Sequence, residues 1–443
     1  LQLTTEYQVN IYGNITGQSS YDINNNTRSS GRKYDPGQRY IVEKTNSLGH
    51  KTQVEYNNRF GLPSKVINPN GLETVHQYDE FGRLAETVYP DGSETNNYFE
   101  WVDEADEYTP DGGLYVSCQD YSNAPAARIY YNFKGQELRA VSDRYSGMLY
   151  QDTRYMNYGK VWKTSEPYFS DETPRWTEYE YDFALRIYKK ITPRTTYKYE
   201  YEGKKTTITN EDAGYSTEKI IDELGLTSTV KDNNLTIDYI YNSAGQPRKI
   251  ISPGGHEIIM DYNIQGNQIL LQDPDAGDME YKYNAFGEMI YQKDANFVEY
   301  NLEYDALGRM VKRICSQETN PALWEYDDAP HSIGKLIKVT GGNGIEKNYY
   351  YDELGRIISQ SEKLDGQAYT TRYQYDSDGN LGRKVFPSGF ALNYSYVDGS
   401  QLWRVSKDDN SLIWRWTKQN ASGQDTEYEY GNHITTSVLY DQA

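Results

Sequence analysis

A short tyrosine-centred phrase, repeated at near-constant spacing, constrains this chain more than any other feature. Between residues 239 and 397 it reads Tyr-x-Tyr-Asp/Asn-x-x-Gly with small changes. Its second tyrosine falls at Tyr241, Tyr262, Tyr283 and Tyr304, so three consecutive steps are each 21 residues long. A fixed period in this range is typical of stacked repeat units rather than of a chain with one closed core.

Each unit predicts a β-hairpin. Tyr-x-Tyr places two rings on one face of a strand, because side chains alternate along it. Asp or Asn then opens a turn, since its short side chain can bond the backbone two residues on. Three residues later, glycine supplies the left-handed position of a type I turn with a glycine bulge. A second turn signal, such as Asn68-Pro-Asn-Gly71 or Ser252-Pro-Gly-Gly255, marks the far end of several units. We therefore expect a continuous antiparallel ribbon of hairpins.

The best copies of the phrase carry a family resemblance. They are Tyr78-Asp79-Glu-Phe-Gly82-Arg83, Tyr304-Asp305-Ala-Leu-Gly308-Arg309 and Tyr351-Asp352-Glu-Leu-Gly355-Arg356. This phrase resembles the YD repeat of the Rhs family, which includes bacterial polymorphic toxins, the cocoon-forming components of Tc toxins, and teneurins. The resemblance covers nearly the whole chain, and it implies an all-β fold. That fold is a spiralling antiparallel β-hairpin repeat array, a YD-repeat shell or solenoid, here an open part of a cocoon.

The residues that define the repeat are predicted to be structural, because their types recur in a turn role in copy after copy. They are Tyr78, Asp79, Gly82, Arg83, Tyr241, Asn242, Gly245, Tyr262, Asn263, Gly266, Tyr283, Asn284, Gly287, Tyr304, Asp305, Gly308, Arg309, Tyr351, Asp352, Gly355, Arg356, Tyr375, Asp376 and Gly379.

The domain organisation follows the repeats. Residues 1–39 are polar and are expected to form an irregular N-terminal lead-in. Residues 40–443 are expected to form the repeat array, with a longer surface loop near 162–176, where Pro167, Pro174 and acidic residues gather. For a complete bacterial Rhs toxin, the resemblance implies an autoproteolytic core and a toxin domain after the repeats. Neither has a counterpart in this sequence, so we expect the array to be truncated before them.

Composition narrows the possible partners. The net charge of −20 argues against nucleic-acid binding, which needs clustered Lys and Arg, and against docking on anionic lipid. Tyr is present in 46 copies against 10 Phe. A tyrosine-rich apolar set suits a thin wall, because the ring packs while the hydroxyl reaches water or backbone. We expect stacked tyrosine ladders between neighbouring repeats.

No pattern predicts catalysis, a cofactor or a metal. The five histidines, at 50, 76, 256, 331 and 433, are not spaced as metal ligands. The alternating carboxylates of Asp273-Pro-Asp275-Ala-Gly-Asp278 could attract Ca²⁺, but they lack a full binding loop, and a turn is the preferred interpretation. Cys118 and Cys315 lie far apart in the array, so a disulfide between them is not expected.

Three functions remain. The favoured one is a non-catalytic shell segment of an Rhs-type toxin, which encapsulates the C-terminal toxic polypeptide of its parent chain for export or delivery. Export or delivery machinery would be a further partner, and a secreted or cell-surface bacterial location would follow. The alternative is a cell-surface carbohydrate-binding or adhesion protein, in which rows of Tyr and Trp, including Trp414 and Trp416, hold glycans. The third is a carbohydrate-active enzyme.

Overall fold

The computed structural model describes residues 2–102 and 109–440, and these form one antiparallel sheet of forty strands. No helix long and apolar enough to cross a membrane occurs within these two ranges. The strands are β1 (Leu3–Val9), β2 (Ile15–Asp22), β3 (Thr27–Tyr34), β4 (Ile41–Thr45), β5 (Lys51–Tyr56), β6 (Pro63–Ile67), β7 (Glu73–Tyr78), β8 (Leu84–Val88), β9 (Glu94–Trp101), β10 (Tyr115–Tyr121), β11 (Ala127–Tyr131), β12 (Glu137–Arg144), β13 (Gly147–Tyr155), β14 (Val161–Ser165), β15 (Tyr168–Phe169), β16 (Trp176–Tyr181), β17 (Ile187–Ile191), β18 (Thr196–Glu202), β19 (Lys205–Asn210), β20 (Tyr215–Ile221), β21 (Thr227–Asp232), β22 (Leu235–Tyr241), β23 (Pro247–Ile251), β24 (Glu257–Tyr262), β25 (Gln268–Asp273), β26 (Gly277–Tyr283), β27 (Met289–Lys293), β28 (Glu299–Tyr304), β29 (Met310–Cys315), β30 (Ala322–Tyr326), β31 (Leu336–Thr340), β32 (Glu346–Tyr351), β33 (Ile357–Leu364), β34 (Gln367–Tyr375), β35 (Leu381–Val385), β36 (Ala391–Val397), β37 (Gln401–Lys407), β38 (Leu412–Gln419), β39 (Asp425–Tyr430) and β40 (Thr435–Ser437).

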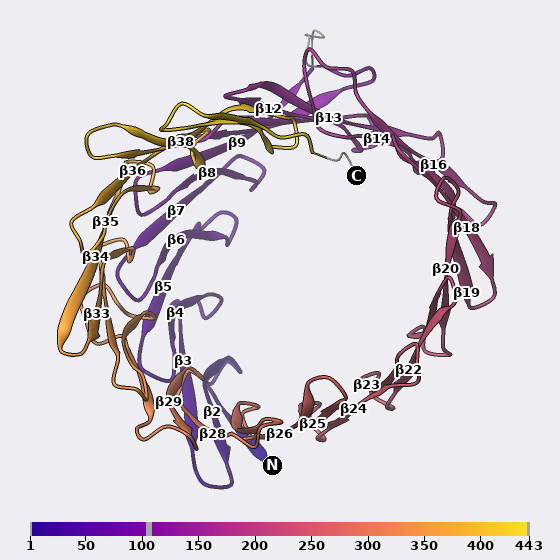
Figure 1. Cartoon of the computed structure of the whole chain (residues 1–443). Coiled ribbons are helices and arrows are strands. Elements are labelled where there is room, and N and C mark those ends of the chain that lie inside the picture. The colour runs from indigo at the N-terminus through magenta and orange to yellow at the C-terminus, as the bar shows by residue number, and fades with distance from the viewer. Residues whose placement is uncertain (1, 103–108, 441–443) are drawn as a thin grey trace.

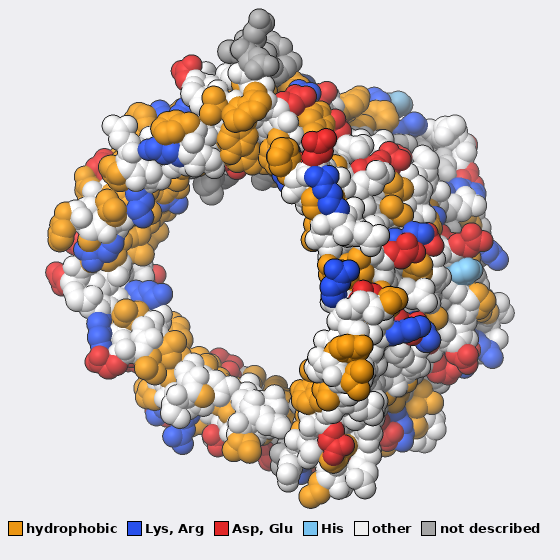
Figure 2. Space-filling model, turned by 180° about the vertical axis from the view of Figure 1, so that it is seen from behind, with side chains coloured by type: hydrophobic (Ala, Val, Ile, Leu, Met, Phe, Trp, Pro, Cys, Tyr) orange, Lys and Arg blue, Asp and Glu red, His pale blue; other side chains and the backbone are white. Residues whose placement is uncertain are grey.

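The sheet is a spiral. Apart from a branch at β13, each strand pairs antiparallel with the next one along the chain. Seen end-on, the sheet curls around a central opening, and β28–β38 return to lie beside β3–β9 (Figure 1). The opening persists when all atoms are drawn (Figure 2). The predicted fold class, an open spiralling array of antiparallel hairpins, is therefore confirmed.

The first 39 residues differ from the irregular segment that the sequence predicts, because β1, β2 and β3 lie within them. Asn10 opens a turn of the repeat type: its Oδ1 accepts the N–H groups of Tyr12 and Asn14, each at 3.0 Å. Gly13 then adopts a φ of 84°. The signal is hidden in the sequence because Val9 stands where other units carry tyrosine, and because β2 and β3 are mostly polar.

The region near 162–176, predicted to be a surface loop, is partly strand. β14 extends to Ser165, and β16 begins at Trp176. Between them, Tyr168 and Phe169 of β15 pair with Tyr150 and Leu149 in the first half of β13, while the second half of β13 pairs with β14. The long β13 thus holds two neighbours on one side, and the sheet branches there.

The branch carries a cluster of buried residues. Its apolar members are Val116, Cys118, Tyr130, Val141, Tyr150 and Tyr168. Asp152 is 2% exposed among them. Its carboxylate accepts hydrogen bonds from Arg139 at 2.6 Å and 2.8 Å and from the Tyr168 hydroxyl at 3.0 Å. Burial, followed by the nearby Asp152 charge, raises the pKa of Tyr168 to about 12, so this phenol stays a donor. The buried charge is therefore fully paired.

Removing one member of this pair should destabilise the branch. We expect Asp152→Ala to cost about 3–5 kcal/mol, because the largely buried Arg139 guanidinium would lose its carboxylate. Hydrogen exchange of the β12–β16 amides in urea measures the loss locally, which suits an array that need not unfold as one unit. Glu427→Ala, which breaks the more exposed pair with Lys418, is the control and should cost under about 1 kcal/mol. Equal effects of the two changes would contradict the assignment.

Candidate functional site

In most units the repeat tyrosine ties its hairpin to the one before it. The Tyr351 hydroxyl donates to the carbonyl of Leu336, the first residue of β31, at 2.6 Å, and Tyr262 donates to the carbonyl of Pro247 at 2.9 Å. The same bond joins Tyr34 to Ile15, Tyr56 to Ile41, Tyr78 to Pro63, Tyr181 to Val161, Tyr201 to Ile187, Tyr241 to Thr227, Tyr304 to Met289, Tyr326 to Met310, Tyr375 to Ile357, Tyr396 to Leu381 and Tyr440 to Asp425. Each accepting carbonyl lies just after the preceding turn, where a bulge shifts the register of the ladder.

The acidic or amide residue that follows the tyrosine closes the turn. The Oδ1 atom of Asp352 accepts the N–H groups of Leu354 at 3.0 Å and Arg356 at 2.8 Å. The Gly355 N–H donates to the Asp352 carbonyl at 2.9 Å, and Gly355 adopts a φ of 75°. This left-handed conformation is open to glycine at no steric cost.

The residue four positions after the turn opener was not assigned a contact from the sequence, and it connects units. In several aspartate units it is arginine: Arg356 Nε donates to Asp352 Oδ2 at 2.7 Å. The Arg356 guanidinium also lies 4.5 Å from the centre of the Tyr375 ring in the next unit. In several asparagine units an amide replaces it, as in the bond from Asn242 Nδ2 to Gln246 Oε1. In the sequence, Arg often stands four positions after an Asp turn opener, and Gln after an Asn turn opener. This pairing was the signal for the contact.

The predicted tyrosine ladder is wrong for the repeat tyrosines among the described residues. Successive repeat tyrosines lie two strands apart, roughly 10 Å, which is too far for their rings to stack. Arginine fills that interval where it is present, with Arg309 4.3 Å from the Tyr326 ring and Arg186 4.2 Å from the Tyr201 ring. Stacked pairs do occur elsewhere, as between Tyr115 and Tyr131 with centroids 4.9 Å apart.

The residues predicted to define the repeat occupy equivalent places. All seven tyrosines are the last residue of a strand: Tyr78, Tyr241, Tyr262, Tyr283, Tyr304, Tyr351 and Tyr375. The seven glycines all have φ between 75° and 86°: Gly82, Gly245, Gly266, Gly287, Gly308, Gly355 and Gly379. The seven turn openers each accept the N–H groups two and four residues on: Asp79, Asn242, Asn263, Asn284, Asp305, Asp352 and Asp376. They are therefore spread along the wall and form no single cluster.

The turns of the sheet form two edges. We call the turns after the repeat tyrosines, such as 79–83 and 352–356, the Asx edge, and the turns at the other end of the hairpins, such as 22–26 and 68–72, the return edge. Where the spiral overlaps itself, the Asx edge of the second coil lies on the return edge of the first. The Asn70 side chain donates to the Ile333 carbonyl at 2.9 Å and accepts the Ile333 N–H at 3.0 Å. We call this contact the seam.

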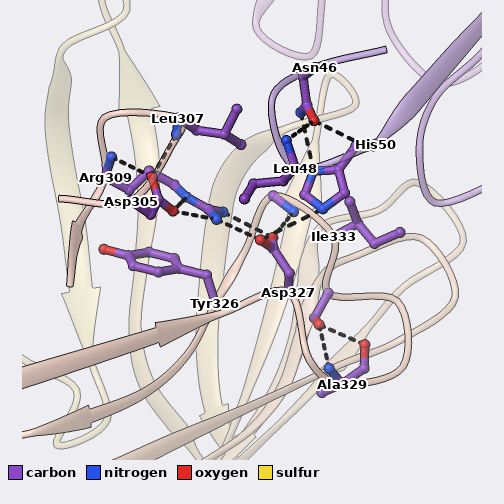
Figure 3. Close-up of polar contacts among 12 residues, drawn as sticks. Asn46, Leu48, His50, Asp305, Leu307, Arg309, Tyr326, Asp327, Ala329 and Ile333 are labelled. Carbon is purple, nitrogen blue, oxygen red and sulfur yellow. Dashed lines mark hydrogen bonds and ion pairs between the residues drawn. The ribbon is translucent and has the colours of Figure 1, made fainter. Parts of the chain in front are cut away.

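The seam continues through charged groups. Arg28 Nη2 donates to Glu288 Oε2 at 2.8 Å and to the Asp305 carbonyl at 3.0 Å. Figure 3 shows His50 of the first coil facing Asp327 of the second, with Nε2 to Oδ2 at 3.8 Å. The Asp327 carboxylate also accepts hydrogen bonds from both terminal nitrogens of Arg309. Further round, the Tyr145 N–H donates to Asp398 at 2.7 Å. Partners 253 to 277 residues apart thus hold one coil to the next.

Two other groups that the sequence offered as candidate ligand sites take part in folding contacts instead. The Oδ1 atom of Asp273 accepts the N–H groups of Asp275 and Ala276, as a turn requires. Trp416, proposed to hold a sugar, is 2% exposed, and its Nε1 donates to the Leu402 carbonyl at 2.9 Å. It therefore takes the place of a repeat tyrosine and cannot offer its face to a glycan.

Comparison with known proteins gives one family match and several solved structures with a similar fold. The RHS Repeat family matches residues 56–94. The chain carries an RHS repeat. The comparison with curated proteins in sequence gives no match. The predicted resemblance is thus confirmed through the family match and through the fold.

The fold of this chain recurs in solved structures. The crystal structure of TcdB2-TccC3 matches 99% of the chain with a TM-score of 0.78 and 14% identity. TcdB2-TccC3 without its hypervariable C-terminal region matches 99% of the chain with a TM-score of 0.80 and 13% identity. The Tc holotoxin pore of Photorhabdus luminescens matches 97% of the chain with a TM-score of 0.78 and 14% identity. The chain spans 28%, 30% and 29% of those chains, respectively.

The tyrosine hydroxyl bond can be tested with two adjacent residues. Tyr351→Phe leaves the Leu336 carbonyl without its donor and should cost about 1–2 kcal/mol. Tyr350→Phe is the control: Tyr350 points to the opposite face and is exposed, so this change should leave the free energy of unfolding almost unaltered. Thermal and urea unfolding measure both. A Tyr350 effect as large as that of Tyr351 would contradict the proposed link.

One turn offers a stabilising change. Leu185 stands where other units carry glycine and holds a φ of 59°, which costs about 1–2 kcal/mol for a side-chain-bearing residue. Glycine lowers that strain but costs about 0.5–1 kcal/mol in chain flexibility. We expect Leu185→Gly to raise the free energy of unfolding by up to about 1 kcal/mol. Leu354→Gly, at an apex without positive φ, should lower the free energy of unfolding. A Leu354→Gly variant more stable than Leu185→Gly would contradict the argument.

The turn 327–335, which forms part of the seam, should open in acid. Hydrogen bonds from Arg309 hold the pKa of Asp327 below its ordinary value, although burial opposes the shift. A depressed pKa stabilises the fold above the unfolded value, near pH 4, and this stabilisation is lost as pH falls through the folded value. Hydrogen exchange of the 327–335 turn at pH 7 and pH 3 should show opening in acid, with less pH dependence in Asp327→Asn. Glu353→Gln, at an exposed turn apex, is the control and should behave as wild type.

Proposed function

We propose that this chain is a non-catalytic wall segment of an RHS-type shell, which encloses a C-terminal toxic polypeptide of its parent protein for export or delivery. The observation that carries the proposal is the single sheet curled around a central opening (Figure 1). Enclosure needs a continuous wall, and the repeat bonds supply it without any reacting group.

The proposed mechanism depends on what the wall offers to a cargo. Around the opening in Figure 2, hydrophobic, basic, acidic and uncharged side chains are interspersed. A wall lined by such a mixture would give an unfolded polypeptide little continuous apolar surface on which to collapse. The seam supports the same role, because it joins consecutive coils into one wall.

Similarity to TcdB2-TccC3 supports the shell. Because the chain spans less than a third of those chains, the cargo, its export machinery and a secreted or cell-surface bacterial location are carried over as parts of the proposal. The proposal assigns no catalytic residue, no cofactor and no metal. A polysaccharide-degrading activity abolished by a single carboxylate substitution would oppose it.

Cryo-electron microscopy of the complete parent polypeptide tests enclosure. We expect a hollow particle whose wall includes this spiral and whose interior holds weak density for the cargo. Protease treatment of the same particle should spare the cargo, whereas Arg28→Ala together with Asn70→Ala, which breaks the seam, should expose it. Asn58→Ala, at an exposed turn, is the matched control and should leave the cargo protected. A solid particle, or a cargo cleaved as fast in wild type as in the seam variant, would overturn the proposal.

A further inference from the structure

A cavity on one face of β3, β4 and β5 is lined by basic and hydroxyl side chains. Its volume is about 520 Å³, and Arg32, Lys44 and Thr52 are among the residues that line it. Arg32 stands directly opposite Lys44 in the pair of β3 with β4, and Lys44 stands opposite Thr52 in the pair of β4 with β5. Opposite residues of paired strands share a face and lie close together. Three hydrogen-bond donors thus stand in a row across the floor of the cavity.

Turns of the return edge form the rim of the cavity. Asn46 and His50 come from the turn between β4 and β5, and Pro69 comes from the turn between β6 and β7. The His50 ring is held on both sides: Nδ1 lies 3.2 Å from Asn46 Nδ2, and Nε2 lies 3.8 Å from Asp327 Oδ2 across the seam. β3, β4 and β5 are each paired with a strand on both sides. The cavity therefore does not arise from an end of the chain.

The charge of the cavity is opposite to that of the protein. The net charge of the chain is −20, yet none of the described residues that line the cavity is Asp or Glu. Arg32 and Lys44 form no ion pair with any described residue, whereas Arg28, on the same face of β3, pairs with Glu288 at 2.7 Å. Like charges that stand opposite each other destabilise a sheet. Two uncompensated cations at such a position indicate that an anion binds between them.

We propose that this cavity binds a phosphate group, either as inorganic phosphate or as a small phosphate monoester. A phosphate monoester carries a charge of about −1.5 to −2 at pH 7, which matches the two positive charges of Arg32 and Lys44, whereas a carboxylate would neutralise only one. The arginine fork binds phosphate oxygens in pairs, and lysine adds a point charge. The hydroxyls of Ser30 and Thr52, which have no hydrogen-bond partner among the described residues, supply further donors.

The remaining lining of the cavity can hold an organic part of the ligand. Ile41 and Pro69 give it apolar surface beside the two basic residues. Small-molecule sites commonly combine such apolar surface with a few polar groups that fix the orientation of the ligand. The inference concerns a ligand site on the wall and stands apart from the enclosure of a cargo, so either can fail without the other.

Isothermal titration calorimetry of the full chain at constant ionic strength tests the proposal. Inorganic phosphate should bind at one saturable site, and acetate should bind at least about tenfold more weakly, because it carries one charge and fewer acceptor oxygens. The double variant Arg32→Gln with Lys44→Gln should lower the phosphate affinity at least about tenfold, because charge-assisted hydrogen bonds are lost. Glycerol 3-phosphate identifies the source of the group: tighter binding than inorganic phosphate supports a monoester, and equal binding supports phosphate itself.

A second variant separates loss of binding from loss of folding. Lys44→Glu gives Arg32 the carboxylate partner that Arg28 already has in Glu288. A pair of opposite charges replaces a pair of like charges, so the thermal unfolding midpoint should rise while phosphate binding is abolished. Phosphate binding that survives in Lys44→Glu would contradict the assignment.

Matched controls and a local measurement place the site. Lys338→Gln with Arg383→Gln removes one lysine and one arginine that already pair with Glu346 and Asp408, and should leave phosphate affinity unchanged. Phosphate should slow hydrogen exchange of the β3–β5 amides and leave that of the β22–β24 amides unaltered. A wild-type chain without saturable phosphate binding, or a double variant of Arg32 and Lys44 that binds phosphate as wild type does, would refute the site.

Discussion

The hydrogen bond from most repeat tyrosines to the hairpin before them is the interaction on which the wall depends. Antiparallel ladders alone would permit a flat or variably twisted ribbon, since adjacent strands can rotate over a range of angles. The tyrosine bond adds a fixed point at the start of each return strand, as in Tyr351 to Leu336. Because the same bond recurs unit after unit, the same local geometry is imposed many times, and the ribbon curves regularly enough to meet itself.

The seam turns that regular curve into a wall. Its contacts join side chains of turns to backbone and side-chain groups of other turns, as in Asn70 with Ile333. Strand edges are not used, because every strand interior to the ribbon is already paired on both sides. Cohesion between coils therefore depends on a few residues at turn apices, whereas cohesion along the ribbon depends on the backbone. The residues that join the coils can therefore change in sequence without changing the pairing of strands along the ribbon.

The repeat period and the turn chemistry were sufficient to predict the fold class, because both act within one hairpin. The 21-residue step from Tyr241 to Tyr304 and the glycines after each turn opener contain that information. The N-terminal strands were missed because Val9 replaces the tyrosine, although Asn10 keeps the turn. The short β15 was missed because its pairing with β13 is set by tertiary contact. The tyrosine ladder failed because the sequence shows which residues share a face but not that successive units lie two strands apart.

The seam could not be predicted at all. Its partners lie some 260 residues apart, and the residues that make it, such as Arg28, Asn70 and His50, are ordinary turn and strand residues in the sequence. Only the curvature of the whole spiral decides which turns meet. The exposure of Phe183 and the burial of Ala285 at like positions are likewise decided by the number of residues in a coil.

The one-by-one pairing of strands has a mechanical consequence. When load falls on a hairpin outside the overlap of the coils, such as that of β22 and β23, the hairpin bears it almost alone, because it contacts little beyond its two neighbours. The hairpins of the wall then unfold one after another, each at a similar force. Where coils overlap, and at the branch around Asp152, the load is shared with distant segments. These regions act as stops, so dismantling proceeds fastest through the plain hairpins between them.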